Sequence, residues 1–160
     1  MDSTAKIYLQ RSLNKISIAK LLLTISNNNK KKQEFQIEED MTFYSGSISH
    51  AYYSIFYATK AILLTKSIKT EMPDVHKKTY EAFKAEFVDS GVLDIELLNI
   101  YQKMIVRADE LLQILKDEKW KRGHYTYQTI PQANKDPAEQ STQNASFFLK
   151  NIKMILDQQN

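Results

Sequence analysis

One short segment of the sequence concentrates side chains that could bind phosphates and stack on bases. Residues 119–127 read Lys-Trp-Lys-Arg-Gly-His-Tyr-Thr-Tyr and contain the single tryptophan and one of the three histidines. Cations interleaved with aromatic rings can bind phosphates and stack on nucleobases. The candidate nucleotide- or RNA-binding residues here are Trp120, Lys121, Arg122, His124, Tyr125 and Tyr127. The alternative is a loop whose rings pack against the protein while its charges stay in water.

A second candidate is the pair Arg107 and Asp109, which lies within a predicted helix. Arginine presents a planar fork of N–H groups that suits phosphate, so the pair could contribute to a nucleotide or RNA site. The alternative is a structural role, in which Arg107 pairs with an acidic side chain across a helical bundle.

A third candidate is a tyrosine cluster on another predicted helix. Residues 49–58 read Ser-His-Ala-Tyr-Tyr-Ser-Ile-Phe-Tyr-Ala. In one interpretation the rings pack into the core and send their hydroxyls outward. In the other, His50, Tyr52, Tyr53 and Tyr57 form a dimer interface or face a ligand. We assign these four residues to a subunit interface.

Composition excludes several kinds of site. The chain has no cysteine, which removes thiolate metal sites and cysteine nucleophiles. Its glycines, at positions 46, 91 and 123, are too dispersed for a P-loop or a dinucleotide fingerprint. No histidine has a glutamate three residues before it, so the Glu-x-x-His motif of di-iron bundles is absent. We therefore expect no metal and no cofactor. The net charge of +3 is well below the clustered excess of a strong nucleic-acid binder.

These candidates need a scaffold, and the composition indicates a helical one. A chain of 160 residues has the size of one domain, and three glycines with three prolines argue against a hairpin-rich β-fold. Apolar residues at three- and four-residue spacing predict helices over residues 4–25, 41–65, 75–89, 92–115 and 136–156. We predict an all-α fold, an up-and-down bundle of four long helices and one shorter helix. Residues 1–160 form a single domain, with an irregular segment at 117–135 before the last helix.

Three local signals mark the ends of the predicted helices. Asp74 is a candidate N-cap, and Gly91 is a candidate glycine stop. Asp136, followed by Pro137 and Glu139, matches a capping box with proline in the first turn.

Residues 41–59 contain no Asp, Glu, Lys or Arg, a length compatible with a membrane span. The segment nevertheless carries serine, threonine and tyrosine hydroxyls along its length, for which hydrocarbon offers no partner. We interpret it as a helix buried on most sides within a soluble bundle. No signal peptide is visible at the N-terminus, so we expect a cytoplasmic protein without membrane association.

Three stretches of the sequence together resemble the HEPN domain (higher eukaryotes and prokaryotes nucleotide-binding), particularly its small single-domain members in archaea and bacteria. They are a helix similar to the family's Ala-Tyr-Tyr-Ala-x-Phe helix, a histidine–phenylalanine block, and an Arg-x-x-Ala-Asp-type helix end with a closing Ala-x-x-Phe helix. In this sequence they are residues 51–64, the block of His76, Phe83, Phe87 and Gly91, and residues 107–109 with 145–152. The resemblance covers roughly residues 5–156.

The resemblance implies a compact helical bundle that is usually a homodimer. Many members are encoded beside a minimal nucleotidyltransferase and act as the toxin of a toxin–antitoxin pair. Active members are metal-independent ribonucleases with an Arg-x(4 to 6)-His motif, in which histidine moves the 2′-hydroxyl proton and arginine stabilises the charge on phosphorus. The closest match here is Arg122, with Tyr127 in the histidine position and His124 two residues after the arginine.

From this resemblance we expect a HEPN-type homodimer that acts with a nucleotidyltransferase partner and binds nucleotide or RNA. One alternative is a metal-independent ribonuclease, with His124 as general base and Arg122 or Arg107 stabilising the phosphorane. Another alternative is a non-catalytic adaptor bundle. In some pairs of this family the partner adds nucleotides to a tyrosine just after the histidine, and Tyr125 and Tyr127 would be the candidates here.

Overall fold

The computed structural model describes residues 3–122 and 135–158, with the side chains of residues 110–122 outside the description. Every regular element in these ranges is helical and no strand occurs in them, which confirms the all-α prediction. The elements are α1 (Ser3–Ser26), α2 (Asn29–Glu34), α3 (Tyr44–Leu64), α4 (Val75–Phe83), the π-helical turn η1 (Lys84–Val88), α5 (Ile95–Arg122) and α6 (Lys135–Gln158).

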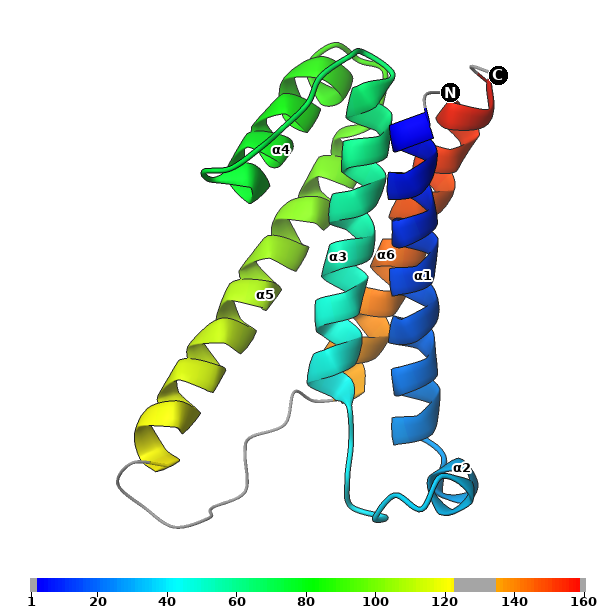
Figure 1. The fold of residues 1–160 in the computed structure, drawn as a ribbon, viewed down its shortest axis with the longest axis vertical. Helices are drawn as coiled ribbons and strands as arrows, with labels where there is room; N and C mark the ends of the chain where they lie inside the picture. Colours follow the sequence, from blue (N-terminus) through cyan, green and yellow to red (C-terminus); the bar gives the residue numbers. More distant parts are fainter. Residues whose placement is uncertain (1–2, 123–134, 159–160) are drawn as a thin grey trace.

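The long helices α1, α3, α5 and α6 run alternately in opposite directions, which confirms the up-and-down bundle (Figure 1). α1, α3 and α6 lie side by side, and α3 packs most extensively against α1. The shorter α4 lies at the end of the bundle where both chain termini are found. α5 lies at an angle to the other long helices and contacts α3 and α6 less extensively.

α3 is buried on most of its sides, as the lack of charged residues over positions 41–59 predicts. Ile55 is fully buried, and the two buried serines of α3, Ser47 and Ser54, are hydrogen-bonded inside the bundle. Ser47 Oγ donates to the Ala19 carbonyl at 2.8 Å, and Ser54 Oγ donates to the Ser12 carbonyl at 3.0 Å. Because these hydroxyls are hydrogen-bonded, their burial is not costly. No helix among the described residues is both long enough and apolar enough to cross a membrane.

Small residues allow α1 and α3 to approach each other closely. Ser12 Oγ also donates to the Ser54 carbonyl at 2.7 Å, and the two hydroxyl oxygens lie 3.1 Å apart. A Cβ atom on Gly46 would lie 3.0 Å from Leu22 Cδ1, so a larger residue there would force a shift. The polar residues of the uncharged segment thus set the spacing of the two helices.

A cluster of three buried rings holds α4, α5 and α6 together. Phe83, Tyr101 and Phe148 are each fully buried. The ring centroids of Phe83 and Phe148 are 5.5 Å apart, and those of Tyr101 and Phe148 are 5.9 Å apart. Such tilted and edge-on contacts are favourable for aromatic pairs, so this cluster fixes the rotation of α6 about its axis.

Most predicted helix ends lie within three residues of the observed ones, but two features differ. α5 continues to Arg122, so residues 117–122, which we predicted to be irregular, are helical. The remainder of that predicted segment, residues 123–134, lies outside the described residues. The short helix α2 has no counterpart in the sequence prediction because six residues are too few for a periodic pattern.

The predicted end signals have mixed outcomes. Gly91 adopts a left-handed conformation with φ of +74°, and its N–H donates to the Val88 carbonyl at 2.9 Å, which confirms the glycine stop. Asp74 occupies the N-cap position of α4 but makes no side-chain cap hydrogen bond, since its own backbone is left-handed. α6 begins at Lys135, so Asp136 lies in the first turn and not at the predicted cap. A carboxylate there still favours the positive end of the helix dipole.

Candidate functional site

The predicted tyrosine cluster divides into one buried residue and an accessible set. Tyr52 is only 7% exposed and packs within its own chain. Its hydroxyl is hydrogen-bonded to His76 Nδ1 at 2.7 Å. His50, Tyr53 and Tyr57 are partly exposed along α3. Of the four residues that we assigned to an interface, three can therefore reach a partner or a ligand, whereas Tyr52 is a packing residue.

His76, near the start of α4, lies against three rings of α3. Its ring centroid is 4.3 Å from that of Phe56, 5.7 Å from that of Tyr52 and 6.1 Å from that of Tyr53. The histidine of the resemblance therefore serves here to attach α4 to α3. The contact joins the end of the bundle to the face on which the accessible tyrosines lie.

The two hydrogen-bonded groups are both neutral near pH 7. Burial, followed by the charge of Lys60, lowers the pKa of His76 below its ordinary value. Burial, followed by the charges of Tyr53 and Asp109, raises the pKa of Tyr52. Because neither group is ionised, the contact between Tyr52 and His76 is an uncharged hydrogen bond with a structural role.

His50 lies on the side of α3 that faces α1. Burial, followed by the positive charge of Lys15, lowers the pKa of His50. Its Nδ1 atom is buried and has no hydrogen-bond partner among the described residues. A neutral ring with an unpartnered buried nitrogen is thus held near Lys15 of α1.

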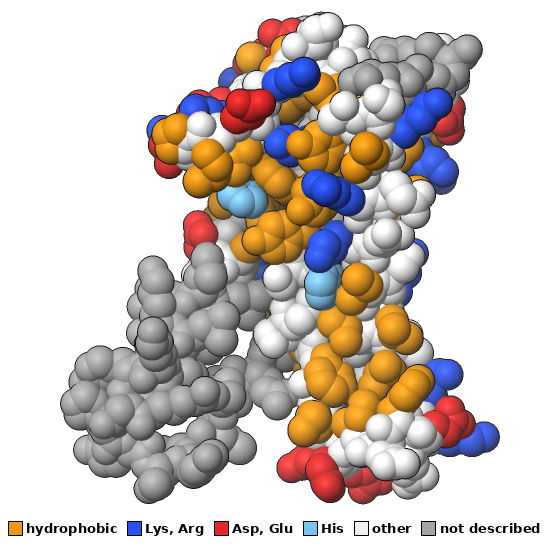
Figure 2. All heavy atoms as spheres, viewed as in Figure 1, with side chains coloured by type: hydrophobic (Ala, Val, Ile, Leu, Met, Phe, Trp, Pro, Cys, Tyr) orange, Lys and Arg blue, Asp and Glu red, His pale blue; other side chains and the backbone are white. Residues whose placement is uncertain are grey.

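The accessible tyrosines share one surface with cations of α1 and α3. Figure 2 shows basic and hydrophobic side chains gathered over the middle of these two helices, with acidic side chains towards the ends and edges of the view. We call this surface the α1–α3 basic face, and it consists of Tyr8, Arg11, Lys15, Tyr53, Tyr57 and Lys60. It brings together aromatic rings and positive charges, the combination that the sequence suggested for a different segment.

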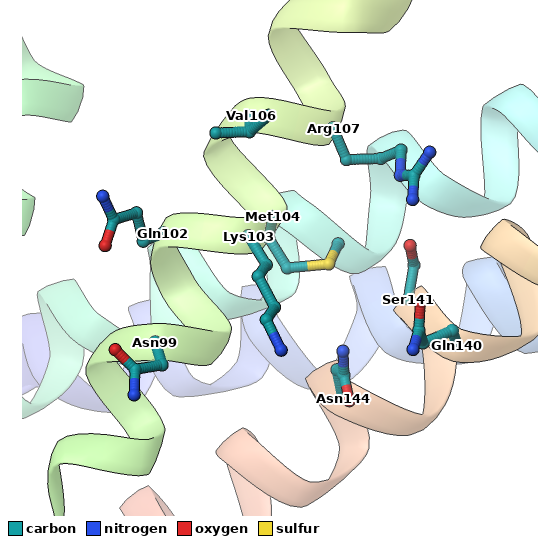
Figure 3. A pocket seen from close by; sticks show the side chains of 9 residues that line it. All are labelled: Asn99, Gln102, Lys103, Met104, Val106, Arg107, Gln140, Ser141 and Asn144. Atoms are coloured by element: carbon teal, nitrogen blue, oxygen red, sulfur yellow. The ribbon is translucent and has the colours of Figure 1, made fainter.

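A pocket of about 470 Å³ opens between α5 and α6. Figure 3 shows its walls, which come from one face of each helix. The lining residues are Asn99, Gln102, Lys103, Met104, Val106 and Arg107 of α5 with Gln140, Ser141 and Asn144 of α6. Two cations and four side-chain amides thus surround one apolar methionine.

The polar groups of the pocket suit an anion that also carries hydrogen-bonding groups. Lys103 and Arg107 are four residues apart, so they lie on the same face of α5. In Figure 3 the Lys103 ammonium points towards Asn144, and the Arg107 guanidinium lies above Ser141 and Gln140. None of the described lining residues is a carboxylate. The charges of Lys103 and Arg107 would attract an anion, and the amides could donate or accept further hydrogen bonds.

The structure separates the predicted pair Arg107 and Asp109. Arg107 is half-buried and lines the pocket on the α6 side. Asp109 is exposed, and its charge acts on Tyr52 of α3. Asp109 is therefore not among the residues that line the pocket, and a binding role for it stays a prediction. Among the described residues, no group of three His, Asp or Glu side chains could hold a metal ion.

The aromatic and basic segment at 119–127 remains a prediction. Trp120, Lys121 and Arg122 belong to the last turns of α5, but their side chains lie outside the described residues. His124, Tyr125 and Tyr127 lie outside the described residues altogether. The candidate ribonuclease pair of Arg122 and His124 is therefore not placed.

Sequence reasoning missed most of the pocket. Lys103 and the amides of Asn99 and Asn144 are ordinary helix-surface residues when they are considered one at a time. The available signal was periodicity, since residues 99, 103 and 107 recur every four positions, as do 140 and 144. The sequence does not show which faces of α5 and α6 meet, because the lining residues of the two helices are distant in the chain.

Similarity searches relate the chain to archaeal proteins. No protein-family model matches it. It is 27% identical over 135 residues to "Putative toxin MJ0605" of Methanocaldococcus jannaschii, covering 84% of this chain and 86% of that protein. It is 35% identical over 81 residues to "Putative toxin MJ0142" of the same organism, covering 48% of this chain and 53% of that protein. It is 38% identical over 71 residues to "UPF0332 protein PH1297" of Pyrococcus horikoshii, covering 43% of this chain and 45% of that protein. The two matches with higher identity thus span about half the length of the relatives concerned.

Proposed function

We propose that this chain is a HEPN-type protein that acts as the toxin of a toxin–antitoxin pair and binds a nucleoside phosphate in the α5–α6 pocket. Two relatives that carry the name of a toxin support the first half of the proposal. The order of the three stretches that resemble the HEPN domain supports the family assignment. On this proposal residues 1–160 form one domain, and the protein works in the cytoplasm, where nucleotides are available.

The α5–α6 pocket carries the second half of the proposal. Its volume of about 470 Å³ lies within the range of roughly 300–1,000 Å³ that is usual for small-ligand sites. Lys103 and Arg107 would bind the phosphate, because charge-assisted N–H···O⁻ hydrogen bonds are stronger than neutral ones. The amides of Gln140 and Asn144 would pair with the polar edge of the base or with the ribose hydroxyls.

The partners of the proposal are a second copy of the chain and a nucleotidyltransferase antitoxin. Exposed apolar side chains support an interface on α1, where Ile7 and Leu21 are each 54% exposed and Ile18 is 36% exposed. These three positions fall on one side of the helix at 100° per residue. Surface apolar residues grouped in this way are typical of protein interfaces.

Growth inhibition in a bacterial host tests the proposed activity. We expect the induced wild-type chain to slow growth and the Arg107→Ala variant to relieve the inhibition, since the variant lacks the guanidinium that would bind phosphate. Arg107→Lys should relieve it only partly, because lysine keeps the charge but loses the planar fork. The matched control is Lys150→Gln, which removes an exposed cation of α6 outside the pocket and should inhibit like the wild type.

Two results would contradict the proposal. One is normal growth while soluble wild-type protein accumulates in the absence of any partner. The other is equal inhibition by the wild type and Arg107→Ala at equal protein levels, which would remove the pocket from the activity.

A further inference from the structure

α1 and α3 together contain no aspartate or glutamate side chain. All of the chain's 19 acidic residues lie elsewhere. The same two helices carry Lys6, Arg11, Lys15, Lys20 and Lys60. A modest net charge of +3 for the whole chain therefore conceals a strongly positive pair of adjacent helices. Local concentrations of one sign of charge attract polyanions even when the total charge is small.

The cations of this surface lie over aromatic rings and not over carboxylates. Arg11 Cζ is 5.7 Å from the ring centroid of Tyr8 and 5.8 Å from that of Tyr57. Lys15 Nζ is 5.8 Å from the ring centroid of Tyr53. Within the described part of the chain, neither cation forms an ion pair. Both positive charges are therefore available to an incoming anion.

Lys60 and the stacked tyrosines complete the face. Lys60 Nζ is 4.8 Å from the ring centroid of Tyr8 and donates to the Thr70 carbonyl at 2.9 Å, so it too lacks a carboxylate partner in the described residues. The rings of Tyr8 and Tyr57 are stacked, with centroids 6.1 Å apart and planes at 17°. Tyr53 lies next in the row, with its ring centroid 6.2 Å from that of Tyr57.

We propose that the α1–α3 basic face binds single-stranded nucleic acid. Arg11, Lys15 and Lys60 would contact successive phosphates, and unpaired bases would stack beside the three tyrosines. This is the combination of a positive surface and aromatic platforms by which proteins bind single strands without reading their sequence. The face extends from Tyr8 to Lys15 on α1 and from Tyr53 to Lys60 on α3, about 10 Å along each helix at 1.5 Å per residue, which is the length of a few nucleotides.

Charge complementarity selects this occupant over a second copy of the chain. A symmetric dimer through the face would bring the same cations against each other, and like charges in an interface are unfavourable. An acidic protein would satisfy the cations but would not need a row of partly exposed tyrosines. The inference rests on α1 and α3 alone, so it is independent of the nucleoside phosphate proposed for the α5–α6 pocket.

The test is fluorescence anisotropy of the full chain with a fluorescein-labelled dodecamer of uridine, measured across a range of salt concentrations. We expect the double variant Arg11→Gln/Lys15→Gln to bind at least tenfold more weakly and to lower the salt slope by about 1.4, since each phosphate contact contributes roughly 0.7 on a single strand. Tyr53→Leu and Tyr57→Leu should each weaken binding about tenfold. A duplex of the same length should bind less tightly because its bases cannot stack on the rings.

Matched variants on the same two helices serve as controls. Lys20→Gln removes a cation of α1 on the opposite side from the face, and Tyr44→Leu removes a tyrosine whose hydroxyl donates to Asn27 at the far end of α3. Both should bind the dodecamer like the wild type. Thermal unfolding followed by circular dichroism identifies any variant that fails to fold. If the double variant does not fold, the single variant Arg11→Gln takes its place, because Arg11 is exposed on the surface.

Three results would overturn the proposal. The first is no binding by the wild type at low salt, and the second is equal weakening by Lys20→Gln and by Arg11→Gln/Lys15→Gln. The third is a loss of affinity in the charge variant with none in either tyrosine variant, which would show that the rings do not stack on bases and that the face is a general polyanion-binding surface. Arg107→Ala should leave dodecamer binding unchanged, so failure of this inference and failure of the nucleotide pocket are distinguishable.

Discussion

Replacement of Phe148 by alanine should destabilise the protein far more than replacement of its neighbour Phe147. Phe148 is fully buried, with its ring centroid 5.5 Å from that of Phe83 and 5.9 Å from that of Tyr101. Truncation of a buried phenylalanine costs about 3–5 kcal/mol, because it removes apolar contacts and leaves a cavity. We expect about 4 kcal/mol for Phe148→Ala, since two aromatic pairs are lost together with the buried surface.

Phe147 provides a control of the same residue type one position away. It is 44% exposed, so Phe147→Ala should change the free energy of unfolding by less than about 1 kcal/mol. Urea unfolding followed by circular dichroism measures both values, and equal slopes against urea show that the variants can be compared. In thermal unfolding, a loss of 4 kcal/mol should lower Tm by about 8–16 °C for a chain of this size.

This comparison bears on the pocket as well as on the core. Residues 140, 144 and 148 are spaced at four, so the rotation of α6 that buries Phe148 also turns Gln140 and Asn144 towards α5. If the two alanine variants lose equal stability, α6 has a different rotation, and both the core and the pocket described above are wrong.

Two further predictions concern pH and the α1–α3 contact. Folding lowers the pKa values of His50 and His76 below their ordinary value of 6.5. The unfolded chain therefore takes up more protons than the folded chain as the pH falls from about 7.5 to 5.5, and the free energy of unfolding should decrease over that interval. Urea titrations at several pH values measure this, His76→Gln should flatten the dependence, and stability that rises on acidification would contradict the burial of these rings. Ser54→Ala should cost about 1–3 kcal/mol because it leaves the buried Ser12 hydroxyl with a poorer set of partners. In a double-mutant cycle, Ser12→Ala and Ser54→Ala together should cost less than the sum of the single changes, and strict additivity would show that the two hydroxyls do not interact.

Much of the fold could be predicted from the sequence because an amphipathic helix has a local pattern of apolar residues. Apolar spacing located the long helices, and the absence of charge in residues 41–59 predicted a helix buried on most sides. Apolar spacing was less informative about where the helices end. α5 extends beyond Leu115 through a stretch rich in lysine, glutamate and aspartate, where apolar periodicity is lost but the helix continues.

The candidate sites were harder to predict because they depend on which helices face each other. Tyr52 and Tyr53 are adjacent in the sequence, yet Tyr52 is buried against His76 and Tyr53 is partly exposed beside Lys15. Arg107 was found from its residue type, whereas Asn144 has no feature that marks it until α6 is packed against α5. Clusters of residues distant in the chain become visible only when the bundle is assembled.

The most direct test of the central claim is a titration of isotopically labelled protein with ATP, followed by NMR. Side-chain amides of asparagine and glutamine give their own signals, so Gln140 and Asn144 report on the pocket directly. We expect these signals to shift on addition of ATP in the wild type and to stay unchanged in Arg107→Ala. Asn151, whose side chain donates to the Phe147 carbonyl on the same helix, should not move in either protein. Saturable shifts confined to the pocket would support a nucleotide site between α5 and α6. Unchanged pocket signals at millimolar ATP, or shifts that persist in Arg107→Ala, would contradict it.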